Sequence, residues 1–160
     1  MSVARTVLAP SGLRNSLGDT ALASFITIMR LGHIALSVSS VVKSAAFYKK
    51  HFGLRQAARY NFKDKGLTII LLKKASLTLE LFEFKKRKPL PQYRKTLDND
   101  LQTVGVKHFS LETKNIEGVY KKFKKARVKF ATELRVFADG KRYFFIKDPD
   151  GILVEIMEGC

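Results

Sequence analysis

Cysteine, tryptophan and long apolar runs are nearly absent from this sequence. Its 160 residues include one cysteine, Cys160, and no tryptophan. A single cysteine excludes an internal disulfide framework and is typical of a reducing compartment. No apolar run approaches the ~20 residues that a membrane-spanning helix needs. We therefore expect a cytoplasmic protein with no membrane partner.

Acidic residues are also scarce. There are 14 of them against 30 lysines and arginines, and the net charge is +16. Such a charge attracts anions, including phosphorylated or carboxylated metabolites, coenzyme A, anionic lipid headgroups and nucleic acid. The lysines are spread over many segments, so a solvated basic surface is the alternative interpretation. No nucleic-acid-binding motif accompanies the charge, and we expect an anionic small molecule as partner rather than nucleic acid.

The first 30 residues differ from the rest of the chain. Residues 1–30 contain no lysine, one acid (Asp19), three arginines and several serines. An arginine- and serine-rich, acid-poor segment resembles a mitochondrial transit peptide, which makes mitochondria the alternative location. The other interpretation is an N-terminal extension upstream of a later start at Met29. We expect a loosely ordered extension.

An internal repeat organises the remaining chain. His33 and His108 stand 75 residues apart (108 − 33), and Glu80 and Glu155 are separated by the same offset (155 − 80). A fixed offset shared by two different motifs indicates a duplicated structural unit. The length and the hydrophobic share of 46% fit one domain, or two half-domains around one core.

Each repeat has the pattern of a βαβββ module. In residues 31–84, alternating strands flank a helix that Ser39 or Ser40 can cap and that ends at Gly53. The same order returns in residues 105–158, and residues 85–104 form a basic, proline-containing linker. We predict an α+β fold of two tandem βαβββ modules that pair into an open, cup-shaped mixed β-sheet. The apolar stripe of the first helix is expected from Val42, Ala45, Ala46, Phe47 and Phe52.

Four polar residues are the candidate site. Strand alternation places His33, Glu80, His108 and Glu155 away from the apolar faces of their strands. If the modules pair about a pseudo-twofold axis, the four side chains can converge on one point. Two imidazoles and two carboxylates suit one divalent metal ion, such as Ni, Co, Zn, Mn or Fe. The alternative is a duplication that has kept these residues in a decayed, metal-free site.

Several motifs together resemble the vicinal oxygen chelate superfamily, which includes glyoxalases, bleomycin-resistance proteins and extradiol dioxygenases. The most specific is Asp148-Pro149-Asp150-Gly151 leading into Glu155. The resemblance covers residues 31–158, and the metal-ligand positions of the family fall on the four candidate residues. The resulting His/Glu/His/Glu set is similar to that of bacterial-type glyoxalase I. Related methylmalonyl-CoA epimerases usually have glutamine where this chain has Glu80.

The resemblance implies a metal-dependent lyase or isomerase of glyoxalase (lactoylglutathione lyase-like) type. Such an enzyme acts through a metal-bound enediolate, with Glu155 and Glu80 as the candidate bases. The substrate would be an anionic thiol adduct or an acyl-CoA, and a homodimer is expected. The alternatives are a methylmalonyl-CoA-type epimerase and a non-catalytic small-molecule binding or resistance protein of the same fold.

Other charged residues are weaker candidates for substrate binding. Arg55 and Arg59 lie in one predicted strand, and Lys141 and Arg142 lie just before another. Each pair could hold an anionic group, or could be solvated surface charge. Glu158 is expected to have a structural role.

Overall fold

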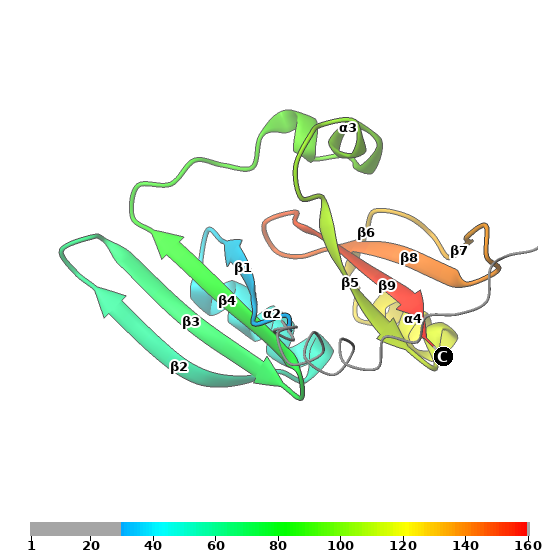
Figure 1. Cartoon of the computed structure of the whole chain (residues 1–160), viewed down its shortest axis with the longest axis horizontal. Helices are drawn as coiled ribbons and strands as arrows, with labels where there is room; N and C mark the ends of the chain where they lie inside the picture. Colours follow the sequence, from blue (N-terminus) through cyan, green and yellow to red (C-terminus); the bar gives the residue numbers. More distant parts are fainter. Residues whose placement is uncertain (1–29, 160) are drawn as a thin grey trace, which may run out of the picture. The chain divides into compact units, whose positions relative to one another are not determined.

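The computed structural model describes residues 30–159 (Figure 1). The chain divides into two units between Leu31 and Gly32, and every element below belongs to the second unit, Gly32–Cys160. The predicted N-terminal extension lies outside the described residues.

The first module contains one helix and four strands. Its sheet has the order β1-β4-β3-β2, with β1 parallel to β4 and the other neighbours antiparallel. The predicted βαβββ order is confirmed. The elements are β1 (Ile34–Ser37), α2 (Val41–Phe52), β2 (Arg55–Phe62), β3 (Leu67–Lys74) and β4 (Leu77–Phe84).

The second module repeats this arrangement after a linker that contains a 3-10 turn, η2 (Gln92–Arg94), and a short helix, α3 (Leu97–Leu101). Its sheet has the order β5-β9-β8-β6, and β7 also pairs with β8. The second strand of the module is thus split into two short pieces. The elements are β5 (His108–Thr113), α4 (Ile116–Lys125), β6 (Lys129–Phe130), β7 (Arg135–Val136), β8 (Arg142–Lys147) and β9 (Leu153–Glu158).

The sequence repeat is preserved in the strand register. Ala35 of β1 lies opposite Glu80 of β4, and Ser110 of β5 lies opposite Glu155 of β9. Both partners in the second pair are 75 residues further along the chain than their counterparts. The two sheets therefore hold their glutamates at equivalent positions.

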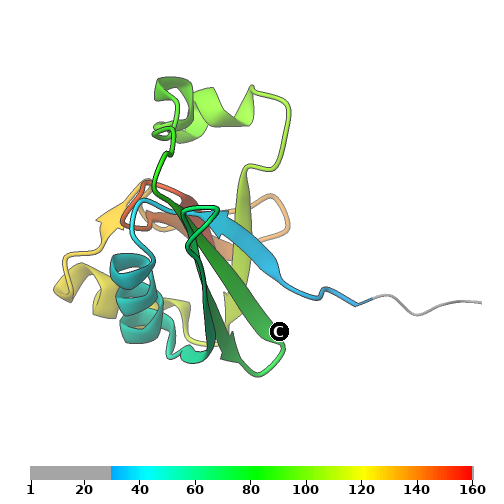
Figure 2. The same cartoon turned by 90° about the vertical axis from the view of Figure 1, so that its left-hand side faces the viewer.

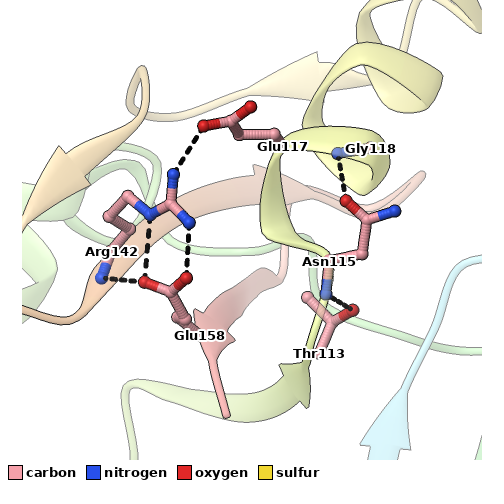
Figure 3. A network of polar contacts seen from close by, with 6 residues as sticks. All are labelled: Thr113, Asn115, Glu117, Gly118, Arg142 and Glu158. Atoms are coloured by element: carbon pink, nitrogen blue, oxygen red, sulfur yellow. Dashed lines mark hydrogen bonds and ion pairs between the residues drawn. The ribbon is translucent and has the colours of Figure 1, made fainter. Parts of the chain in front are cut away.

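The two long helices begin at equivalent caps. The Ser40 hydroxyl accepts a hydrogen bond from the backbone N–H of Lys43 at 3.4 Å. The Asn115 side chain accepts from the N–H of Gly118 at 2.9 Å (Figure 3). These bonds satisfy donors that the first helical turn leaves free. At the other end of α2, Gly53 adopts φ = 71°, a conformation that glycine reaches without strain.

The buried face of α2 differs from the predicted stripe. Val42 is 61% exposed, whereas Val41 and Tyr48 are 1% and 0% exposed. With 3.6 residues per turn, Val41, Ala45 and Tyr48 share one face, and Val42 lies about 100° away from Val41. The prediction was therefore wrong for Val42, and likewise for the exposed Ala46.

One hydrophobic core includes residues of both modules. In Figures 1 and 2 the helices α2 (cyan) and α4 (yellow) lie side by side. Phe52 of α2 meets Phe123 of α4 with 5.6 Å between ring centroids. Tyr48 of α2 lies 6.4 Å from Phe109 of β5. The sheets hold their apolar faces toward these helices, which leaves the opposite faces for polar residues.

A buried carboxylate links the modules. Asp148, in the turn before β9, is 2% exposed and accepts a hydrogen bond from the Tyr48 hydroxyl at 3.0 Å. The N–H groups of Asp150 and Ile152 donate to its other oxygen at 2.9 and 2.8 Å. Burial raises the pKa of Asp148 to about 6, although these hydrogen bonds favour the ionised form.

This raised pKa predicts a pH-dependent contribution to stability. Asp148 binds its proton more tightly in the folded protein, where its pKa is about 6, than in the unfolded chain, at about 3.8. It therefore favours folding most at or below about pH 3.8, and this contribution is lost as the pH rises through about 6. The size is at most about 3 kcal/mol.

We expect Asp148→Asn to abolish this dependence. Between pH 4 and 7 (approximate limits set by the two pKa values), the free energy of unfolding of the wild type should fall relative to that of the variant. Urea denaturation at a series of pH values measures the difference. Parallel pH profiles for the two proteins would contradict the prediction.

Candidate functional site

The four candidate residues form two His–Glu pairs. His33 Nε2 lies 3.1 Å from Glu80 Oε2, and His108 Nε2 lies 3.4 Å from Glu155 Oε2. His33 immediately precedes β1 and Glu80 is on β4, whereas His108 begins β5 and Glu155 is on β9. The parallel strand pairs β1/β4 and β5/β9 bring each histidine beside its glutamate. The structure thus forms the same arrangement once in each module.

The second pair is less accessible than the first. The side chains of His108 and Glu155 are 27% and 16% exposed, against 53% and 21% for His33 and Glu80. The His108 ring packs edge-on against Phe145, with 4.9 Å between centroids. Its Nδ1 atom is buried and has no hydrogen-bond partner among the described atoms. Packing therefore fixes the orientation of His108 with its Nε2 atom toward Glu155.

Each pair offers an imidazole nitrogen and a carboxylate oxygen, donors that suit a first-row divalent metal ion. The pairs lie on different sheets. Within residues 30–159, no group of three or more His, Cys, Asp and Glu side chains is placed to hold a metal. Each pair therefore supplies half of a ligand set that suits a metal ion. That all four residues converge on one ion stays a prediction.

Arg142 has a structural role. Its guanidinium donates two hydrogen bonds to Glu158 at 3.0 and 2.5 Å and one to Glu117 at 2.6 Å (Figure 3). These contacts link β8, β9 and the first turn of α4. The ion pair lowers the pKa of Glu158 to about 2. Since its donors are engaged, Arg142 is a poor candidate for holding an anionic substrate.

A cavity of about 850 Å³ lies beside His108. Its walls come from β1, the first residues of β5, the turn before β9 and the linker between the modules. Arg55 and Arg59 are on β2, which does not line the cavity. The sequence predicted only a connector over residues 85–104. The four consecutive basic residues 85–88 were the feature of the sequence that could have indicated that the linker lines a binding cavity.

Comparison with known proteins identifies the family. The sequence model of the Glyoxalase/Bleomycin resistance protein/Dioxygenase superfamily matches residues 30–156, which include both modules and the linker. The chain belongs to this superfamily, and the predicted resemblance and fold class are confirmed. No helix in the described part of the chain has the length and hydrophobicity needed to cross a membrane.

Individual relatives include two epimerases. The chain is 26% identical over 142 residues to the human protein named "Methylmalonyl-CoA epimerase, mitochondrial", covering 86% of this chain and 78% of the relative. It is 28% identical over 134 residues to an "Ethylmalonyl-CoA/methylmalonyl-CoA epimerase" of Cereibacter sphaeroides, covering 81% and 97%. The solved structure of a glyoxalase family protein from Enterococcus faecalis superimposes with a TM-score of 0.70 at 25% identity, covering 81% and 97%.

Proposed function

We propose that this protein is an epimerase of a 2-substituted acyl-CoA, of the kind named in its relatives. The observation that carries the proposal is the pairing of Glu80 and Glu155 with a histidine at equivalent positions of two sheets. Inverting a carbon next to a carbonyl needs one base on each face of that carbon. A duplicated His–Glu pair provides two such carboxylates, so Glu80 would act here as a base at a position where related epimerases usually carry glutamine.

The reaction divides between the two carboxylates. One glutamate accepts the proton from the carbon next to the thioester carbonyl, and the C–H electrons move toward the carbonyl oxygen. The other glutamate, protonated at the start, donates its proton to the opposite face, which restores the C–H bond with inverted configuration and exchanges the protonation states of the two glutamates. A divalent metal held by His33, Glu80, His108 and Glu155 would supply Lewis-acid stabilisation of the developing negative charge.

We propose further that two copies of the chain complete the site. Each chain carries one pair on the β1/β4 side and another on the β5/β9 side. In a homodimer with a twofold axis, the first pair of one chain and the second pair of its partner would form one four-ligand site. The symmetry then creates two identical sites per dimer.

Epimerisation can be tested directly on the full chain loaded with a divalent metal. Each epimer of methylmalonyl-CoA is incubated in D2O, and NMR follows loss of the proton at carbon 2 while circular dichroism follows inversion. We expect both signals to change together and to converge from either epimer. Deuterium incorporation no faster than in buffer, with Ni, Co, Zn, Mn and Fe each tried, would contradict the proposal.

Glu80 supports a second candidate, the glyoxalase-type isomerisation of a hemithioacetal. It provides a carboxylate where related epimerases usually carry glutamine, and it stands within 3.1 Å of His33. This reaction also transfers a proton at a carbon next to a carbonyl, so the same residues would serve. Thioester formation from methylglyoxal and glutathione distinguishes it, because an epimerase produces no new thioester absorbance.

A further inference from the structure

The linker contributes a cationic wall to the cavity beside His108. Six basic residues line the cavity. Five of them belong to the linker, residues 85–104, and the sixth is Lys107, just before β5. A cavity of about 850 Å³ is within the range that encloses small organic ligands. The basic residues in the lining are Lys85, Arg87, Lys88, Arg94, Lys95 and Lys107.

Two of these cations have structural roles. The buried carboxylate of Asp100 accepts hydrogen bonds from Arg94 Nε at 3.0 Å and Lys107 Nζ at 3.4 Å. Arg94 also donates to the carbonyl of Val106 at 3.0 Å. These contacts join the start and the end of the α3 segment. The linker is thereby held in place over the cavity.

Further contacts anchor the linker to the second module. Lys147 Nζ, at the end of β8, donates to the backbone carbonyl of Lys95 at 2.7 Å. A Cβ placed on Gly151 would lie 3.6 Å from Leu90, so this linker residue packs beside the turn before β9. These contacts fix the linker at Leu90 and Lys95 beside the second module.

The other cations are available to a ligand. Lys85, Arg87, Lys88 and Lys95 are exposed, and none takes part in an ion pair among residues 30–159. Within the described part of the chain, Arg87 donates only to the carbonyl of Phe84, at 3.3 Å. Four cations that line one cavity repel one another and attract a multiply charged anion.

The acidic residues of the lining do not neutralise these four cations. Asp100 is already paired with two cations. Asp150 accepts hydrogen bonds from the Ser39 N–H at 2.9 Å and the Ser44 hydroxyl at 3.5 Å, and among residues 30–159 it forms no ion pair with a linker cation. The lining thus combines the cations of the linker with apolar residues, which include Leu36, Val38, Phe109, Ile152 and Leu153.

We infer that the linker residues Lys85, Arg87, Lys88 and Lys95 bind the phosphate groups of a thioester carrier whose apolar part lies against the apolar residues of the cavity lining toward His108. Phosphates are the multiply charged anions that lysine and arginine bind most strongly. A long ligand with phosphates at one end and a thioester at the other fits a cavity whose lining includes both the linker cations and the candidate metal-binding residue His108. This inference rests on the proposed function for its thioester end.

The test measures binding separately from catalysis. Calorimetry gives the affinity of the full chain for coenzyme A, its 3′-dephospho form and pantetheine, none of which can be epimerised. We expect affinity to fall in that order and to weaken with rising salt concentration. The double variant Lys88→Glu/Lys95→Glu should bind coenzyme A about 100-fold more weakly, about tenfold for each charge-assisted hydrogen bond removed. Its affinity for pantetheine should stay unchanged.

A matched control has the same change in net charge elsewhere. Lys121→Glu/Lys125→Glu alters two exposed lysines of α4 that do not line the cavity, and we expect it to bind coenzyme A as the wild type does. Equal weakening in both double variants would overturn the inference in favour of a general charge effect. Epimerisation with an unchanged KM in the linker variant would overturn it while the proposed function stands. Linker-dependent binding without epimerisation would support it and contradict the proposed function.

Discussion

Glu155→Gln and Glu80→Gln are each expected to lower the rate of inversion by about 10²–10⁴-fold, the usual contribution of a positioned base. Glutamine keeps the shape of the side chain and removes the proton acceptor. If the two carboxylates act on opposite faces of the substrate, each variant should still exchange the proton of one epimer with D2O, and the two variants should act on opposite epimers. NMR of each separate epimer measures this selectivity.

The control for these variants is Glu112→Gln. Glu112 is an exposed glutamate on β5, in the same strand as His108, and its replacement has the same effect on net charge. We expect it to retain wild-type turnover. Wild-type inversion by Glu155→Gln would remove this residue from the site, and loss of exchange for both epimers in either variant would contradict the division of roles.

Mixing two inactive variants should restore activity. One variant carries His33→Ala and Glu80→Gln, and the other carries His108→Ala and Glu155→Gln, so each chain keeps one intact pair. In a twofold dimer that shares its sites, a mixed dimer has one wild-type site and one site with both pairs altered. Random mixing makes half of the dimers mixed, and we expect about a quarter of wild-type turnover.

Differently tagged chains allow the mixed dimer to be purified and its metal content measured. One divalent ion per mixed dimer is expected, against two in the wild type, because one complete set of ligands remains. Each variant alone should be inactive. A purified mixed dimer with neither turnover nor metal would contradict a site shared between chains.

The local features of this protein could be predicted from the sequence because each depends on near neighbours. Strand alternation predicted that Glu80 and Glu155 lie on the polar face of their strands. In the structure both glutamates lie opposite equivalent residues of the neighbouring parallel strand, Ala35 and Ser110. Gly53 ends α2 as predicted, and Ser40, one of the two predicted caps, begins it, since capping involves residues within one turn of each other. The offset of 75 residues carried the βαβββ pattern from one module to the next.

Only the tertiary structure decided which residues meet across the chain. Tyr48 and Asp148 are 100 residues apart, and nothing in either local pattern indicates their hydrogen bond. Arg142 was a candidate for substrate binding until the fold placed Glu117 and Glu158 beside it. The linker cations became a cavity wall because Asp100 and Lys147 hold that segment in place. The sequence by itself determined the order of strands and helix in each module and the equivalence of the two His/Glu pairs. These features follow from residue periodicity, helix caps and a fixed repeat offset, all of which are visible in the linear sequence. Contacts between residues far apart in the sequence determined where the cavity lies and which charged residues have structural roles.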